Sequence, residues 1–282
     1  MGRRWFTRAF VALMLGLSQG GVQAAEEAQL VGLINHYRSE VQRCGTQASE
    51  ELPPLSADPR LLLPATGRAD LQAAMASSGY PMVNVQAISL SGPRDAASAL
   101  QVLKESFCQI VLDPQFVDIG VSRQDRDWRI LLARPLLAGR LGDWQAEGQK
   151  LLEQVNQART TARQCGSQHF APAPALGWNE LLGSTAHTHS RAMANGNFFA
   201  HQDQDGRTPG DRAELAGYGG QRVGENIAAG LDSASKVVAG WLASPGHCAN
   251  LMNPQFTELG AAYASDPKSD AGIYWTAMFG AP

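Results

Sequence analysis

The sequence predicts an α+β fold, and three observations support this. Segments in the second half of the chain keep apolar residues at helical spacing or are bounded by helix-capping residues. Near the C-terminus, a stretch rich in aromatic and branched residues indicates a strand with a hairpin partner before it. Helical and strand-like segments do not alternate regularly, which favours helices packed on an antiparallel sheet over a βαβ arrangement.

Two helices are expected from their apolar pattern and their ends. Glu147–Arg163 carries apolar residues at helical spacing, namely Leu151, Leu152, Val155 and Ala158. Asn179–Asn195 is rich in alanine and contains few residues that interrupt a helix. Asn179 is expected to cap its N-terminus, and Gly196 follows its last residue.

A third helix and a hairpin are expected after these. Ser233–Ala243 is predicted to be helical, capped by Asp232 or Ser233, and to end before Pro245. Ala271–Phe279 is predicted to be a strand, with Glu258–Ala264 as its hairpin partner. The core is expected to include Trp178, Trp241 and Trp275.

The composition excludes several classes of protein. With 282 residues, of which 44% are hydrophobic, the chain is neither disordered nor a small disulfide framework, and it is long enough for one or two domains. The formal net charge of −3 provides no strongly basic surface, so no nucleic-acid partner is expected.

The N-terminal segment predicts export. Arg3, Arg4 and Arg8 precede or flank the start of a short apolar run over residues 9–17, and Val22-Gln-Ala24 follows with small residues. This is the pattern of a secretory signal peptide, expected over residues 1–24. The mature protein is therefore predicted to be periplasmic or extracellular, without a transmembrane anchor after signal cleavage, because no later stretch is long and apolar enough.

The cysteines are expected to form disulfides. There are four, Cys44, Cys108, Cys165 and Cys248, and an exported chain folds in an oxidising compartment. No Cys-x-x-Cys pair indicates a zinc site. Four cysteines allow three connectivities, and their spacing alone does not choose among them.

The chain contains an internal repeat. Leu33–Arg38 matches Gln154–Arg159 at an offset of 121 residues, and in each copy a cysteine follows nine residues after the asparagine. Cys108–Phe116 matches Cys248–Phe256 at an offset of 140, a register that Gly120 and Gly260 keep. The second copy therefore has 19 additional residues between its cysteines, and we predict a duplicated domain.

The repeat predicts the domain boundaries and favours one disulfide pattern. The first copy is expected over residues 25–140 and the second over 141–282, joined near the small, glycine-containing stretch 138–143. If each copy is a domain, Cys44 pairs with Cys108 and Cys165 pairs with Cys248. The alternative is pairing across the copies, Cys44 with Cys165 and Cys108 with Cys248.

Short runs in the second copy carry a family resemblance. They are Ala200-His201-Gln-Asp-Gln-Asp-Gly206, Val223-Gly-Glu225-Asn-Ile-Ala228 and Trp241-Leu-Ala-Ser-Pro-Gly-His247. In this order, within about Leu151 to Phe279, they closely resemble the CAP superfamily of cysteine-rich secretory and pathogenesis-related (SCP-like) proteins, in its bacterial secreted branch. The resemblance implies an α-β-α sandwich with a central cleft.

The resemblance also implies the residues that line this cleft. Carried over position by position, they are His201, Glu225 and His247. The family's second glutamate is commonly a few residues after the tryptophan, where this chain has Ser244. Some members bind a divalent cation in the cleft, so His201 and His247 are the candidate metal ligands, with zinc favoured over calcium or magnesium.

The chemistry of these three side chains allows more than one role. Two imidazoles and a carboxylate can hold a zinc-type ion with a position open for water, which the metal would acidify. Without metal, Glu225 beside a histidine is a candidate general base. The structural alternative is that the three side chains bond one another and hold the surrounding loops. No nucleophile signature supports hydrolysis: Gly-x-Ser-x-Gly and His-Glu-x-x-His are absent from the sequence.

Two other polar features are expected to be structural. His187 and His189 are two residues apart on a predicted helix and therefore do not share a face. We expect them at the surface or hydrogen-bonded, with one able to reach the rim of the cleft. Asp203–Gly206 is only a partial match to a calcium loop, since its glycine is in fourth place, so a turn is expected.

The first copy lacks the cleft residues. Phe107 precedes Cys108 where His247 precedes Cys248, and Tyr80-Pro-Met82 stands near the expected position of His201. Trp128–Ala133 still has the pattern of the final strand. We predict a degenerate CAP-like domain that serves as a scaffold or binding surface, packed against the intact one.

Two functions are compatible with these predictions. The first is an exported binding or envelope-interaction module, whose cleft takes a divalent cation and a lipid, peptide, glycan or envelope protein. The alternative is a metal-assisted, peptidase-like hydrolase that uses His201, Glu225 and His247, with Glu225 as the candidate catalytic residue. The missing nucleophile signature favours the first.

Overall fold

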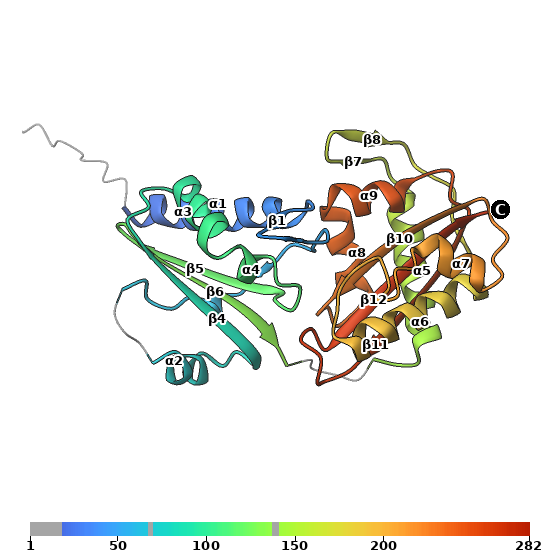
Figure 1. Cartoon of the computed structure of the whole chain (residues 1–282). Coiled ribbons are helices and arrows are strands. Elements are labelled where there is room, and N and C mark those ends of the chain that lie inside the picture. Colours follow the sequence, from blue (N-terminus) through green and yellow to red (C-terminus); the bar gives the residue numbers. More distant parts are fainter. Residues whose placement is uncertain (1–18, 67–69, 137–140) are drawn as a thin grey trace, which may run out of the picture.

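The computed structural model describes residues 19–66, 70–136 and 141–282, with the side chains of residues 19–22 left aside. The chain forms two α+β halves that lie side by side, the first on the left of Figure 1 and the second on the right. Each half has its own sheet and its own buried apolar clusters, so the predicted fold class is confirmed.

The first half begins with a long helix and ends with a hairpin. Its helices are α1 (Gln19–Arg38), η1 (Pro59–Leu61, a 3₁₀ turn), α2 (Leu71–Ser78), α3 (Ala96–Ser106) and α4 (Cys108–Val111). Its strands are β1 (Arg43–Cys44), β2 (Gln47–Ala48), β3 (Ser56–Ala57), β4 (Met82–Ser91), β5 (Asp118–Gln124) and β6 (Asp127–Pro135). Strands β3, β5, β6 and β4 form one sheet in that order, and β1 pairs with β2.

The second half has the same plan, and its described residues form five α-helices where those of the first half form four and a 3₁₀ turn. Its helices are α5 (Trp144–Arg159), α6 (Glu180–Gly196), α7 (Pro209–Leu215), α8 (Ala234–Ala243) and α9 (Pro245–Met252). Its strands are β7 (Arg163–Cys165), β8 (Gln168–Phe170), β9 (Gly177–Trp178), β10 (Arg222–Ala229), β11 (Glu258–Ser265) and β12 (Ile273–Ala281). Strands β9, β11, β12 and β10 form one sheet in that order. These four strands take the same places in their sheet as β3, β5, β6 and β4 in the sheet of the first half.

The sequence repeat corresponds to matching buried contacts in the two halves. Arg38 and Arg159, 1% and 0% exposed, each donate from their guanidinium groups to backbone carbonyls of the segment after the second cysteine. The acceptors are Val111, Asp113 and Phe116 in the first half, and Leu251, Asn253 and Phe256 in the second. The offsets are the 121 and 140 residues of the repeat. A common origin by duplication stays a prediction.

The second half is an α-β-α sandwich. Helices α5, α8 and α9 pack with one face of the sheet around Trp241, Trp275 and Phe279, all of them fully buried. Helix α6 packs on the opposite face through Leu182, Ala186 and Met193. The core positions predicted for Trp241 and Trp275 are confirmed, and Trp178 is half-buried against the same cluster.

The expected helix caps at Asn179 and Ser233 are confirmed, but Gly196 is the last residue of α6 and does not follow the helix. The side chain of Asn179 accepts hydrogen bonds from Leu181 N and Leu182 N, and that of Ser233 accepts from Lys236 N. The predicted helix 147–163 was placed too far along the chain: α5 covers Trp144–Arg159. It begins after the Asp143 cap, and residues 163–165 pair with β8 instead of continuing the helix.

Both disulfides follow the pairing that the repeat favours. Cys44 is bonded to Cys108, which joins the β1–β2 hairpin to α4, and Cys165 is bonded to Cys248, which joins the β7–β8 hairpin to α9. Pairing across the copies is therefore wrong. The second bridge holds the residue next to His247.

The predicted signal peptide lies mostly outside the described residues, which begin at 19, and its expected cleavage point after Ala24 falls within α1. The predicted joint at 138–143 also lies in part outside them, at 137–140. Over the part of the chain that the structure describes, no helix has the length and apolar character needed to cross a membrane.

The two halves pack against each other along a seam, by which we mean the contacts between residues 19–136 and 141–282. Arg134 donates to the backbone carbonyl of Ser269, and Pro53 packs on Gly240. The loop after β2 reaches the second half at α9, and the chain segment before β5 reaches it at Gly230. The seam brings Glu50 and Glu51 next to the predicted site.

Candidate functional site

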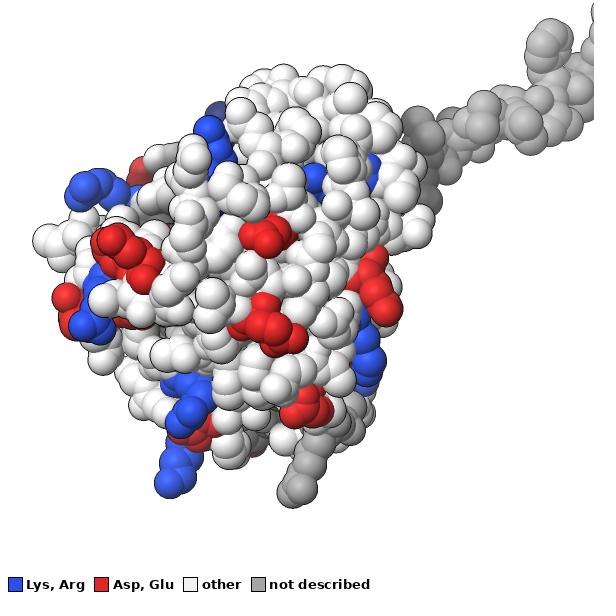
Figure 2. Space-filling view, turned by 90° about the vertical axis from the view of Figure 1, so that its right-hand side faces the viewer, with Lys and Arg blue, Asp and Glu red and all other residues white. Residues whose placement is uncertain are grey.

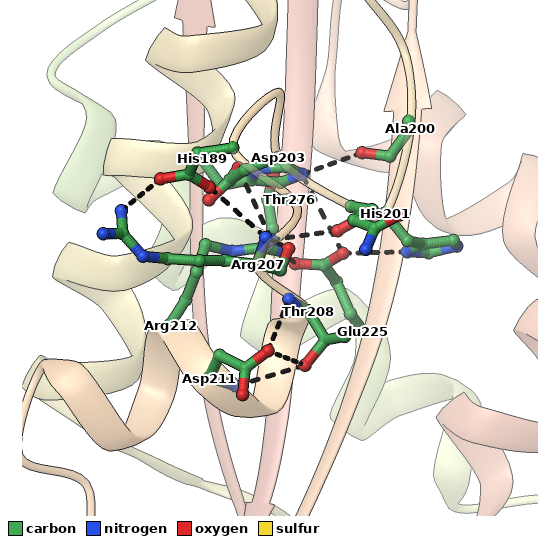
Figure 3. A network of polar contacts seen from close by, with 12 residues as sticks. His189, Ala200, His201, Asp203, Arg207, Thr208, Asp211, Arg212, Glu225 and Thr276 are labelled. Carbon is green, nitrogen blue, oxygen red and sulfur yellow. Dashed lines mark hydrogen bonds and ion pairs between the residues drawn. The ribbon is translucent and has the colours of Figure 1, made fainter.

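The predicted site residues come from three different elements of the second half. Glu225 lies on β10, opposite Met278 of β12, and its side chain points toward α6 and α7 (Figure 3). His201 lies in the loop that follows α6, whose end is turned by Asn197 in the left-handed conformation (φ 49°). His247 lies in the first turn of α9. The structure thus brings together His201, Glu225 and His247, which are far apart in the sequence. We call these three residues the His201 cluster.

Glu225 is the centre of this cluster. Its side chain is 1% exposed, and each of its oxygens has a partner. His201 Nδ1 donates to Oε1 at 2.8 Å, and Arg212 Nη2, from α7, donates to Oε2 at 2.5 Å. The predicted cleft carboxylate is therefore buried, and its charge is balanced by a guanidinium group.

His201 is the accessible member of the cluster, with a side chain 32% exposed. Burial works to lower its pKa, but the hydrogen bond and the charge of Glu225, with the charge of Glu50, outweigh burial and raise the pKa above the usual value. In Figure 3 its ring lies at the edge of the network, with Glu225 on one side. His201 is thus more exposed than Glu225 and His247, whose side chains are 1% and 4% exposed.

His189, expected to be structural, is a full member of the network. It is 0% exposed, with Nδ1 at 2.7 Å from Asp203 Oδ1 and Nε2 at 3.0 Å from Ala200 O. Burial lowers its pKa, as does Arg212, against the opposing charges of Glu225 and Asp203. His187, by contrast, stacks on Trp144 with ring centroids 4.5 Å apart. The segment 203–206 is a turn, as predicted.

His247 is buried without a hydrogen bond at one ring nitrogen. The residue is 3% exposed, and among the described residues its Nδ1 has no hydrogen-bond partner. Burial, with the charge of His201, lowers its pKa to about 3. The nearest carboxylate oxygen, 3.7 Å from Nδ1, belongs to Glu51 of the first half. The structural alternative, in which the three side chains bond one another, therefore holds for His201 with Glu225 but not for Nδ1 of His247.

Ser244 and the first half meet at this point. Ser244 is fully buried and donates its hydroxyl to Glu51 Oε2 at 2.7 Å. The neighbouring Glu50 accepts a hydrogen bond from the backbone N–H of His201 at 3.4 Å. Sequence reasoning missed both glutamates and Arg212, and it expected His189 and Asp203 to have structural roles. Only the Glu50-Glu51 pair just after the first cysteine's hairpin could have drawn attention to the first half.

A cavity of about 580 Å³ lies along the seam beside the cluster. Its lining includes Glu50, Asp113 and Asp270, the aromatic residues Phe198, Phe199 and Tyr274, and several amide and apolar side chains. No lysine, arginine or histidine is among the described residues that line it. On the end of the second half, by contrast, acidic and basic side chains are interspersed, with no continuous basic patch in that view (Figure 2).

The arrangement does not present an assembled metal site. Within residues 19–66, 70–136 and 141–282, no group of three His, Cys, Asp or Glu side chains is placed to hold a metal ion. The physical reason at Glu225 is the Arg212 guanidinium, which occupies one carboxylate oxygen and would repel a cation there. Binding of a divalent cation by His201 and His247 stays a prediction.

Comparison with known proteins identifies the family of the second half. Residues 152–279 match the model of the CAP family, described as the cysteine-rich secretory protein family. The uncharacterized protein YkwD of Bacillus subtilis is 35% identical over 101 residues, which is 36% of this chain and 37% of that protein. The uncharacterized membrane protein YlbC of the same organism is 35% identical over 85 residues, 30% of this chain and 25% of that protein.

Similar solved structures include two bacterial proteins. An extracellular SCP-domain protein of Bacillus anthracis is 26% identical, with a TM-score of 0.43, and the match covers 56% of this chain and 53% of that one. An outer surface protein of Borrelia burgdorferi is 20% identical, with a TM-score of 0.43, and the match covers 51% of this chain and 98% of that one. The chain thus spans well under half the length of the two curated relatives.

Proposed function

Residues 152–279 belong to the cysteine-rich secretory protein (CAP) family, and from this premise we propose that the chain is an exported binding module. One observation carries the proposal. Glu225, the residue expected to act as a base, is buried with both oxygens engaged, by Arg212 and by His201. A carboxylate in this setting fixes the geometry of its neighbours, and the exposed edge of His201 is left to meet a ligand.

The hydrolase alternative demands a different arrangement. A general base needs a free oxygen within reach of the proton that it takes, and a metal-assisted hydrolase needs three protein ligands and an open position. Glu225 would first have to leave Arg212, an ion pair that is desolvated on both sides because the two side chains are 1% and 6% exposed. Breaking such a pair is costly. The geometry therefore favours binding over hydrolysis.

The lining of the adjoining cavity favours one class of ligand. Glu50 joins the two features, because it contacts His201 and also lines the cavity. Three carboxylates and three aromatic rings suit a positively charged side chain, which gains from the negative field and from the ring faces. An acyl chain would have to desolvate those carboxylates. We therefore propose a peptide with lysine or arginine side chains as the ligand.

Export is supported by two independent features. The chain begins with a signal-like segment, and both of its disulfides are of the kind that persist in oxidising compartments. The matching family is itself described as secretory.

The test is calorimetric titration of tetralysine into the full chain, beside the same peptide with acetylated side chains. We expect binding of tetralysine alone, weakened by salt, and weakened roughly tenfold by Glu50→Gln through loss of one charge contact. Glu214→Gln, which changes an exposed carboxylate on α7, is the matched control and should bind normally. Equal affinity for the acetylated peptide, or binding of a neutral chitin oligomer instead, would contradict the proposed ligand class.

A second titration tests the hydrolase alternative. Zinc is titrated into the wild-type chain and into the double variant His201→Ala, His247→Ala, with His169→Ala as the control for an exposed histidine. As a binding module, the chain should show no tight one-to-one zinc binding that depends on His201 and His247. Such binding, lost in the double variant, would make the hydrolase the better hypothesis.

A further inference from the structure

We infer that Glu51, a residue of the first half, is the second acidic member of the His201 cluster and positions His247, so that the site is built from both halves. The inference deepens the proposed function and rests on it only in taking the cluster as the functional site. The second half has Glu225 but no carboxylate at Ser244, and the Glu51 carboxylate lies against that serine.

The first support is the hydrogen bond of Ser244. This serine is the N-cap residue of α9, yet its side chain makes no capping bond to that helix. Its hydroxyl instead donates to Glu51 Oε2 at 2.7 Å; Ser244 is fully buried, and the Glu51 side chain is 28% exposed. A hydrogen bond to a charged acceptor is stronger than one between neutral groups. The side chain of Ser244 thus binds the Glu51 carboxylate of the first half and does not cap α9.

The second support is the shape of α9. A Cβ atom at Gly246 would lie 2.3 Å from Glu51 Oε1 and 2.6 Å from Oε2, far inside contact distance. Only glycine therefore lets the carboxylate approach this helix so closely. The approach is at the first turn of α9, where the helix dipole favours a negative charge. The helix surface is complementary to a carboxylate that reaches it from the other half.

The third support is the buried nitrogen of His247. Within the part of the chain that the structure describes, its Nδ1 lacks a hydrogen bond, and it faces Glu51 Oε2 at 3.7 Å, about 0.5 Å beyond an N–H···O bond. A buried polar atom without a partner costs free energy, and Glu51 is the carboxylate within reach. A small movement of Glu51 or of the ring would complete the bond. Glu51 therefore sets the orientation of His247.

The segment that carries Glu51 is itself held firmly. Just before it, Ser49 N donates to Gln42 O, and just after it the buried Leu52 N donates to Arg38 O. The Cys44–Cys108 disulfide anchors the same hairpin to α4. Glu51 is thus presented by the folded core of the first half, and this gives a function to a half that lacks the histidines of the second.

The experiment transfers the carboxylate from one half to the other. Four variants are made in the full chain: Glu51→Gln, Glu51→Ala, Glu51→Ala with Ser244→Glu, and Glu40→Gln as the control for an exposed glutamate of the first half. The first readout is the ¹⁵N NMR signals of the His247 imidazole, which report its hydrogen bonds. The second is the tetralysine titration. Glu51→Gln keeps the size of the side chain, so it guards against loss of folding in Glu51→Ala.

We expect both single variants at Glu51 to shift the His247 signals well beyond the spread of the Glu40→Gln control. Tetralysine affinity should fall roughly tenfold, the effect of one charged hydrogen-bonding group. Ser244→Glu, which fills the space left by Glu51→Ala, should restore the affinity and return the His247 signals toward those of the wild type. Recovery of this kind is not expected from a glutamate that merely packs the seam.

Unchanged His247 signals in folded Glu51 variants, or a double variant no better than Glu51→Ala, would overturn the inference. Failure of the proposed function would look different. The wild-type chain would then not bind tetralysine, while the His247 signals would still respond to Glu51 and to Ser244→Glu.

Discussion

The two halves of the molecule have the same sheet order and the same buried arginine contacts, but they differ in what covers the second face of the sheet. In the second half, α6 and α7 cover that face, and they carry the buried side chains of His189 and Arg212. In the first half a short helix, α2, covers part of it with Met75 and Tyr80. The shared contacts maintain the fold, whereas the polar site depends on particular side chains of the second half, including Arg212 from α7.

The difference teaches that fold and site depend on different residues. Arg38 and Arg159, with Asn35 and Asn156, make the same backbone contacts in both halves. They belong to the repeated motif, and none touches the His201 cluster. The first half has these contacts without the histidines, and it contributes to the site through Glu50 and Glu51 instead.

Among the tests of this comparison, removal of one disulfide at a time should have the largest effect on the free energy of unfolding. Cys44→Ser with Cys108→Ser, and Cys165→Ser with Cys248→Ser, open loops with sequence separations of 64 and 83. Each should lower the free energy of unfolding by about 4 kcal/mol. Hydrogen exchange should locate the loss in the half that was changed, and the second pair should also disturb His247. A loss spread equally over both halves would show that they unfold as one unit.

The buried arginines provide the next test. Arg38→Ala and Arg159→Ala each leave carbonyls without a donor inside the core, so each should cost about 3 kcal/mol in denaturant unfolding. Similar losses would strengthen the equivalence of the two halves. A much smaller loss for Arg38→Ala would break it. Arg60→Ala, at an exposed surface pair, is the control and should cost less than about 1 kcal/mol.

The paired glycines should show a smaller effect. A Cβ at Gly120 would lie 2.3 Å from Leu61 O, and one at Gly260 would lie 2.0 Å from Gly183 N. Alanine at either position forces backbone segments apart, and we expect about 2 kcal/mol of destabilisation in each case by thermal unfolding. Gly32→Ala on α1, where a Cβ meets nothing, is the control. A neutral Gly120→Ala would mean that the first half packs more loosely than the second.

The smallest expected effect is the pH dependence of stability, which depends on histidines of the second half. Because the folded pKa of His247 is about 3, the unfolded chain binds a proton below pH 6.5 that the folded chain does not. Stability should therefore fall as the pH drops from 6.5 toward 3, by up to about 1.4 kcal/mol per pH unit. The raised pKa of His201 acts in the other window, where stability is lost as the pH rises through its folded pKa.

Urea unfolding from pH 8 to pH 4 measures both effects. In His247→Gln the acid slope should shrink, and the residual acid slope includes His189, whose pKa is also lowered by burial. An unchanged slope in this variant would mean that His247 is not held neutral by burial. His36→Gln, at an exposed position of the first half, should leave the profile as it is.

Much of the second half followed from local sequence patterns. Asn179 and Ser233 cap their helices through their own side chains, and the apolar spacing of α5 gave its buried face if not its ends. Short-range rules suffice for such features, because the partners are within four residues of each other. The correction at residues 160–163 came from a hairpin whose partner strand, β8, has little pattern of its own.

The sequence by itself determined the fold class, the disulfide pairing favoured by the repeat, and the presence of His201, Glu225 and His247 in one motif set. Only the tertiary structure decided that Arg212 and His189 bond into this set and that Glu51 reaches it from 193 residues away along the chain. Local patterns record which face of an element is buried. Which buried charges meet across a seam depends on how two folded halves pack, and no short-range periodicity encodes that.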